Sequence, residues 1–219
     1  MNILEKRVLQ LIGEDPGDPD VFTDDSTGMA QIRSSLNDAI EEICLITGSH
    51  KRKHHVPIES GKNFYQISND RDYFAWPTSV WLTGQKRRLE QVDLNWLVNY
   101  NYRWMYETGT PERYFIIGEN KLGVHPRPGG SNYMLEIDSV VIPEAYTLDT
   151  DRIKLRDSFQ YAAVHFAVSE YWASVGDART ATDHFKTYLD RIGLQDLYQD
   201  SHERVWVKAT VKDDQVERI

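Results

Sequence analysis

The chain has 219 residues, of which 40% are hydrophobic and 27% charged, and its formal net charge is −9 at pH 7. This composition is typical of a soluble globular protein, and the excess of acids disfavours a protein that holds nucleic acid on a basic face. A single cysteine excludes an internal disulfide and suits a reducing cytosol, and without a run of about 20 apolar residues no membrane-spanning helix is predicted.

Two helices are predicted in the first 50 residues. Asn2 and Glu5 have the spacing of a capping box, and Gly13 can end the helix that they begin. A second helix follows the acidic loop 14–25 and ends at Gly48. The apolar faces are formed by Leu4, Val8 and Leu11 in the first helix and by Met29, Ile32, Leu36, Ile40, Ile43 and Ile46 in the second.

From about residue 52 to 143 the hydrophobic period changes to two, which predicts β-strands. The first two strands meet at the turn 60–62, and Pro77 places the next at a sheet edge or a bend. Asp93 can cap a short helix within this region. Residues 111–138 then predict a three-stranded β-meander. Because the connections are short, antiparallel pairing is favoured over parallel crossovers.

Helical spacing returns at about Asp151. The apolar residues from Leu155 to Trp172 cover more than one face, which predicts a helix buried on several sides. Gly176-Asp177 joins a helix stop to the next cap, and Gly193 ends the helix that follows. So tight a connection predicts that the two helices pack as an antiparallel αα-hairpin.

The sequence contains no recognisable catalytic, cofactor-binding or metal-binding constellation, which predicts that the protein is not an enzyme. His54 and His55 are neighbours and would point to opposite faces of a strand, so they do not form a chelating pair. His165 and His184 lie among apolar helical residues, where packing histidines are commoner than ligands. Cys44 lies on or beside the apolar stripe of the second helix and behaves there as a small hydrophobe.

Aromatic residues gather in one short stretch, which contains Trp96, Tyr100, Tyr102, Trp104 and Tyr106. Such residues form stacking platforms for sugars or single-stranded bases, and they are also enriched at protein interfaces. A third interpretation is a half-buried strand, because their spacing is close to two. Given the negative net charge, we interpret Trp96, Tyr100, Tyr102 and Trp104 as a protein interface.

The last residues, 201–219, are polar except for a short alternating segment. Val205, Val207, Ala209 and Val211 alternate with Trp206, Lys208 and Thr210, which is the period of a strand with an aromatic anchor. Such a segment can add to the edge of a neighbour's sheet. Val205, Trp206, Val207 and Val211 are therefore candidate interface residues, and a frayed terminus without contacts is the alternative.

A local pattern in the β region carries a family resemblance. Pro111 and Tyr114 open a hairpin, Leu122 precedes Pro126-x-Pro128, and Tyr133 and Leu135 follow on the next strand. With the order of helices, β region, helices and tail, this pattern resembles the head–tail adaptor (connector) proteins of tailed bacteriophages.

The expected fold is therefore α+β. Helices from both ends form a bundle, a mostly antiparallel β domain is inserted between them, and an extended C-terminal tail follows. The expected divisions are residues 1–50, N-terminal helices; 51–145, β-rich insertion; 146–195, C-terminal helical hairpin; and 196–219, tail.

The resemblance implies a structural protein of the virion, assembled in the cytoplasm of the bacterial host. It implies a dodecameric ring docked beneath the portal protein, which joins capsid to tail and extends the DNA channel. The implied partners are the portal protein, tail nozzle or tube proteins and other copies of the chain, while duplex DNA passes without specific binding. No catalytic residue, cofactor, metal or membrane is implied. The alternative is an aromatic-rich β module of a tail or fibre accessory protein that binds a glycan or receptor.

Overall fold

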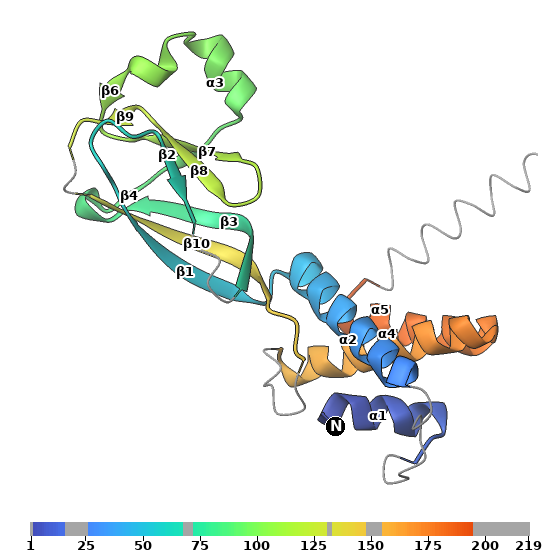
Figure 1. Ribbon diagram of the computed structural model, residues 1–219. Coiled ribbons are helices and arrows are strands. Elements are labelled where there is room, and N and C mark those ends of the chain that lie inside the picture. The colour runs from blue at the N-terminus through green and yellow to red at the C-terminus, as the bar shows by residue number, and fades with distance from the viewer. Residues whose placement is uncertain (1, 16–25, 68–71, 131–132, 148–154, 195–219) are drawn as a thin grey trace, which may run out of the picture. The chain divides into compact units, whose positions relative to one another are not determined.

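The computed structural model describes residues 2–15, 26–67, 72–130, 133–147 and 155–194, and the chain divides into two compact units (Figure 1). The helical unit comprises residues 1–43 and 145–219, and the β unit comprises residues 44–144. Helices from both ends of the chain thus form one unit, with the strands inserted between them. The predicted fold class, α+β with a mostly antiparallel β region, is confirmed.

The helical unit contains α1 (Ile3–Ile12), α2 (Ser26–Thr47), α4 (Asp157–Val175) and α5 (Ala178–Ile192). The capping box is present, since the Asn2 side chain accepts from Leu4 N and the Glu5 side chain accepts from Asn2 N. α4 ends at Gly176, whose φ of 92° is left-handed, and Asp177 caps α5 at once. α4 packs on α5, so the predicted helical hairpin is confirmed.

On each of α1 and α2, one residue predicted to lie on the apolar face is largely exposed. α1 packs on α4 and buries Leu4, Val8, Leu9 and Ile12, whereas Leu11 is 44% exposed. At about 100° per residue the buried arc runs from Leu4 to Leu9, and Leu11 lies just outside it. On α2, Ile43 and Cys44 are fully buried, whereas Ile46 in the last turn is 45% exposed.

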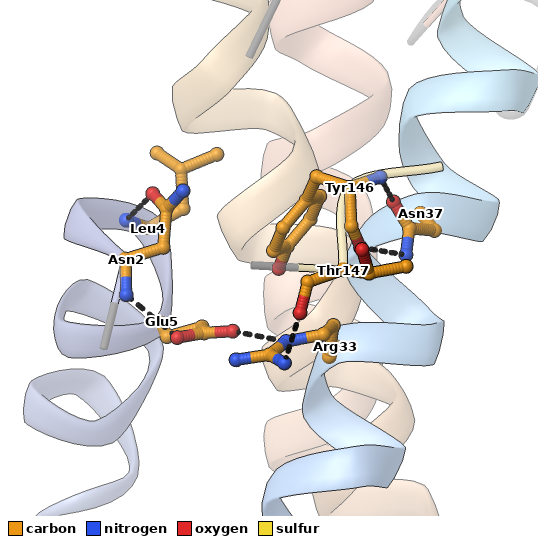
Figure 2. Close-up of polar contacts among 7 residues, drawn as sticks. All are labelled: Asn2, Leu4, Glu5, Arg33, Asn37, Tyr146 and Thr147. Carbon is orange, nitrogen blue, oxygen red and sulfur yellow. Dashed lines mark hydrogen bonds and ion pairs between the residues drawn. The ribbon is translucent and has the colours of Figure 1, made fainter. Parts of the chain in front are cut away.

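Polar contacts link α1, α2 and the segment that returns from the β unit (Figure 2). Arg33 Nε lies 2.7 Å from Glu5 Oε1, and Arg33 Nη1 donates to the Thr147 carbonyl at 2.6 Å. Asn37 donates to the Tyr146 carbonyl at 3.2 Å and accepts from the Tyr146 amide at 3.1 Å. Arg33 and Asn37 of α2 therefore hold α1 and the segment with Tyr146 and Thr147 next to α2.

A pair of histidines connects α4 with α5. His165 Nδ1 lies 3.0 Å from His184 Nδ1, and the rings stack with their centroids 5.3 Å apart. One Nδ1 must donate and the other accept, so the accepting ring is neutral. Burial, then the charges of His184 and Arg191, lower the pKa of His165 to about 4, and burial also lowers the pKa of His184.

We expect the free energy of unfolding to decrease as the pH falls from about 6.5 to 4. The unfolded chain takes up protons near the ordinary histidine pKa of 6.5, whereas folded His165 is protonated only near 4. The stabilisation is therefore complete above pH 6.5 and is lost through this window, by about 1–2 kcal/mol because the ring is partly solvated. Urea titrations of wild type and His165→Gln test this: the variant should have the flatter pH profile, and identical profiles would contradict the account.

Among the described residues, the β unit contains two four-stranded sheets and one parallel strand pair. The first sheet has the order β1 (Lys51–Pro57), β10 (Met134–Pro143), β3 (Asp72–Leu82), β4 (Arg87–Arg88). The second has the order β2 (Phe64–Gln66), β8 (Lys121–His125), β7 (Arg113–Ile117), β5 (Glu90–Gln91). The parallel pair is β6 (Thr108–Gly109) with β9 (Arg127–Pro128).

Strand pairing departs from the prediction in two places. β7 and β8 form the expected hairpin, but β10, predicted as the third strand of a meander, pairs with β1 and β3 in the first sheet. β1 and β2, predicted to meet across the turn 60–62, lie in different sheets. At these points consecutive strands lie in different sheets. The apolar sides of the two sheets therefore face each other across one core. Two short pairs, β5 with β7 and β6 with β9, are parallel.

Pro77 lies at a bulge in β3, as the sequence predicts. The register with β10 shifts between Asp138 and Ser139, where Thr78 is the extra residue on β3. β4 pairs only with the last two residues of β3, so Pro77 also lies on an edge that no described strand covers. A missing amide hydrogen costs little there.

The second sheet has a hydrophobic core on each face. The larger core, between the two four-stranded sheets, contains Ile58, Tyr65, Ile67, Phe74, Val80, Leu82, Leu89, Tyr114, Leu122, Val124, Leu135 and Ile137. The smaller core contains Leu97, Trp104 and Phe115 and lies against α3 (Leu94–Tyr100). Tyr114 and Phe115 are consecutive on β7, so they point to opposite faces. Phe115 therefore packs against Leu97 of α3, and this contact attaches the helix to the sheet.

Candidate protein interface

The aromatic stretch contains α3 (Leu94–Tyr100) and a 3-10 turn (Trp104–Tyr106), so its interpretation as a strand is wrong. The Asp93 side chain caps α3 by accepting from Asn95 N at 2.7 Å and Trp96 N at 3.3 Å. Residues four apart lie on one face of a helix. Trp96 and Tyr100 therefore stack, with ring centroids 5.0 Å apart and an interplanar angle of 11°.

An exposed aromatic surface results, which we define by Trp96, Tyr100, Tyr102, Met105 and Tyr106. Tyr102 and Tyr106 are 78% and 77% exposed, Tyr100 64%, and Trp96 and Met105 45% each. Five large apolar side chains are thus exposed within eleven residues, and exposed apolar side chains that gather in one region mark binding sites.

Trp104, predicted as part of the interface, lies beneath this surface. It is only 6% exposed and packs edge-to-face on Phe115, with centroids 5.2 Å apart. Phe64 contacts both rings from β2. Gly123 on β8 pairs with Phe115, and a Cβ there would lie 2.2 Å from the ring. The exposed surface therefore rests on a close-packed base, which holds it in a fixed shape.

Two arginines border the aromatic surface. The Arg113 guanidinium carbon lies 5.2 Å from the Trp96 centroid and 5.5 Å from the Tyr100 centroid, and Arg103 lies 5.2 Å from the Tyr102 centroid. Such cation–π contacts order the rings and place positive charge over their faces. The sequence pattern identified the rings but not Arg113, because Arg113 reaches the stack from β7.

The geometry suits recognition of a partner. Among the described residues, no group of three or more His, Cys, Asp or Glu side chains could hold a metal ion. A hollow of 460 Å³ adjoins Phe64 and is lined mainly by Lys62, Tyr65, Gln66, Ile117 and Lys121. Its apolar lining can bind an apolar side chain, and Lys62 and Lys121 can pair with an acidic group beside that side chain. The tail candidates Val205, Trp206, Val207 and Val211 lie outside the described residues.

A family model described as SU10 adaptor protein matches residues 3–211, which cover nearly the whole chain. The chain belongs to the SU10 adaptor protein family. The resemblance to phage head–tail adaptors is thereby confirmed, and the general role of this SU10 adaptor protein is that of a structural phage adaptor. A comparison with curated proteins returns no match.

The family match implies a virion component that associates with other proteins of the phage head or tail. None of the described helices has the length and apolarity needed to cross a bilayer. For an SU10 adaptor protein, an exposed aromatic surface on a packed base is a candidate contact with those proteins, and Trp96, Tyr100 and Tyr102 remain predicted interface residues.

Proposed function

We propose that this SU10 adaptor protein forms a dodecameric ring beneath the portal, which joins capsid to tail and extends the DNA channel. The observation that carries the proposal is the family match over residues 3–211, because it includes residues of both units. Copies related by a rotation that closes on itself make head-to-tail contacts and form a ring. Portal protein, tail nozzle or tube proteins and neighbouring copies are the partners, and assembly takes place in the host cytoplasm.

The net charge of −9 fits a channel through which DNA moves. A neutral or negative lumen does not attract phosphates, so the duplex slides without specific binding. The protein has a purely structural role in this proposal, without catalytic residues or a cofactor.

A second candidate function rests on the stacked Trp96–Tyr100 pair. Exposed aromatic faces also bind sugars, so a glycan- or receptor-binding module of a tail accessory protein is the alternative. Position in the particle separates the two functions, since an adaptor lies at the portal and a receptor-binding module at the distal end of the tail. Immunogold labelling of virions tests this.

The C-terminal tail gives a further prediction. Deleting residues 201–219 should leave a folded protein that no longer docks onto portal-containing particles, measured by co-sedimentation. Trp206→Ala should weaken docking less, because burial of this side chain contributes about 2–3 kcal/mol at ~25 cal/mol per Å². Val216→Ala, outside the alternating segment, is the control. Normal docking of the truncated protein would show that the tail has no such role.

A further inference from the structure

The aromatic surface lies in the basic part of an acidic chain. Residues 86–127 contain seven Lys or Arg and five Asp or Glu, a net charge of +2. Subtracting these from 25 bases and 34 acids leaves 18 bases and 29 acids elsewhere, a net charge of −11. A partner for this region is therefore expected to carry acidic groups.

Three arginines here form no hydrogen bond with a carboxylate among the described residues. Arg103 is exposed and forms no ion pair with a described residue. Arg127 donates from Nη2 to Thr108 at 3.2 Å, and its buried Nε has no hydrogen-bond partner among the described atoms. Arg113 Nε lies 3.6 Å from Glu90, beyond hydrogen-bonding distance.

Two of the neighbouring acids are already engaged by other groups. Glu107 accepts from Asn101 at 2.9 Å and lies 3.0 Å from His125 Nε2. Glu112 accepts from Arg87 at 3.0 Å. The three arginines therefore retain donors for carboxylates that come from outside the described fold.

The matching ligand is an extended segment with an aromatic side chain between two acids. In an extended chain, residues two apart lie on the same side. Asp196, Tyr198 and Asp200 have this spacing, with Leu197 as a second apolar residue and no Lys or Arg from 195 to 200. Such a segment can place one ring on the aromatic surface and a carboxylate on each flank.

A second stretch, Asp20-Val21-Phe22-Thr23-Asp24, has the same spacing. It joins α1 to α2, so both of its ends must return to the helical unit, and its reach is limited. Residues 195–200 follow α5, and no described element comes after them in the sequence. This segment can therefore extend further from its own helical unit.

We propose that residues 195–200 of one copy bind the aromatic surface of a neighbouring copy. Tyr198 packs on the Trp96–Tyr100 pair. Asp196 and Asp200 pair with the arginines at its edge. Segment and surface are different patches of the same chain, so the contact is head-to-tail and repeats from copy to copy. The inference rests on the proposed ring, and it names the contact that links its subunits.

The test places a photo-cross-linker on the surface and identifies what it captures. Full-length Tyr102→p-benzoylphenylalanine protein is irradiated in virions and free in solution, using a mixture of isotope-labelled and unlabelled copies. Mass spectrometry should find residues 195–200 of a different copy. Tyr73, 58% exposed on β3, is the control position. Capture of the chain's own segment, of residues 16–25, of a portal or tail protein, or of nothing would overturn the proposal.

A charge swap gives an independent readout. Arg103→Asp should lower the intermolecular cross-link yield about fivefold, and Asp196→Arg or Asp200→Arg in the same chain should restore it. Equal yields in all variants would contradict the pairing. Absence of this contact can be distinguished from absence of the ring. If the subunits meet through other surfaces, a ring beneath the portal is still visible by cryo-EM.

Discussion

Replacing Gly123 by alanine is expected to lower the free energy of unfolding by about 2–3 kcal/mol. A Cβ at Gly123 would lie 2.2, 2.3 and 2.8 Å from three atoms of the Phe115 ring. Phe115 is fully buried with Leu97 and Trp104, so its ring cannot withdraw without opening the smaller core. Urea unfolding followed by tryptophan fluorescence measures the loss, because Trp104 contacts this ring.

Gly130→Ala is the matched control, since a Cβ at Gly130 has no heavy atom within 4 Å. It should change stability by less than about 0.5 kcal/mol. Phe115→Leu combined with Gly123→Ala should cost less than the sum of the two single variants, because the smaller side chain makes room for the methyl group. Similar losses for Gly123→Ala and Gly130→Ala would contradict the close-packed base beneath the aromatic surface.

Glu5→Ala is expected to lower the free energy of unfolding by about 3 kcal/mol. The Glu5 side chain is 0% exposed and has two roles: Oε2 accepts from Asn2 N at 2.7 Å, and Oε1 pairs with Arg33 Nε at 2.7 Å. Alanine removes the Glu5 half of the capping box and leaves Arg33, which is 31% exposed, without this carboxylate. Thermal unfolding followed by far-UV circular dichroism measures the loss.

Glu5→Gln separates the two roles. Its side-chain oxygen can still accept from Asn2 N, whereas the ion pair with Arg33 is lost, so an intermediate cost is expected. Lys6→Ala removes a charge from the next residue, which is exposed, and should change stability little. If Glu5→Ala costs no more than Lys6→Ala, the contacts in Figure 2 do not hold the helical unit together.

The helix ends could be predicted from sequence because their signals are local. The Asn2–Glu5 capping box, the stop at Gly176 and the cap at Asp177 each depend on residues within one turn. The exposure of Leu11 and Ile46 could not, because each depends on what packs against the helix. Periodicity predicts which face of a helix is apolar, but not how much of that face a neighbouring element buries.

Strand pairing was predicted only where it is local. The hairpin of β7 and β8 is closed by a short turn and was foreseen, whereas β10 pairs with β1 more than 70 residues away. Sequence alternation shows which side of β10 is apolar, but not which strands lie beside it. The parallel pairs β5–β7 and β6–β9 contain two residues each, too few to leave a hydrophobic pattern.

The candidate interface could be located from the sequence, but its exposed rings could not be distinguished from the buried Trp104. Composition identified the aromatic stretch, and Asp93 correctly signalled a helix. The burial of Trp104 beneath the exposed rings follows from Phe115 and Gly123 on the second sheet, which are distant in sequence. The contribution of Arg113 likewise depends on β7 lying against α3.

A cryo-EM reconstruction of the intact virion, with this chain identified by its density, tests the proposed function most directly. We expect a closed dodecameric ring between portal and tail, with the channel continuous through its centre. We also expect density from the C-terminal residues at a neighbouring copy or at the portal. Density for this chain at the distal end of the tail, or its absence from the head–tail junction, would contradict the account.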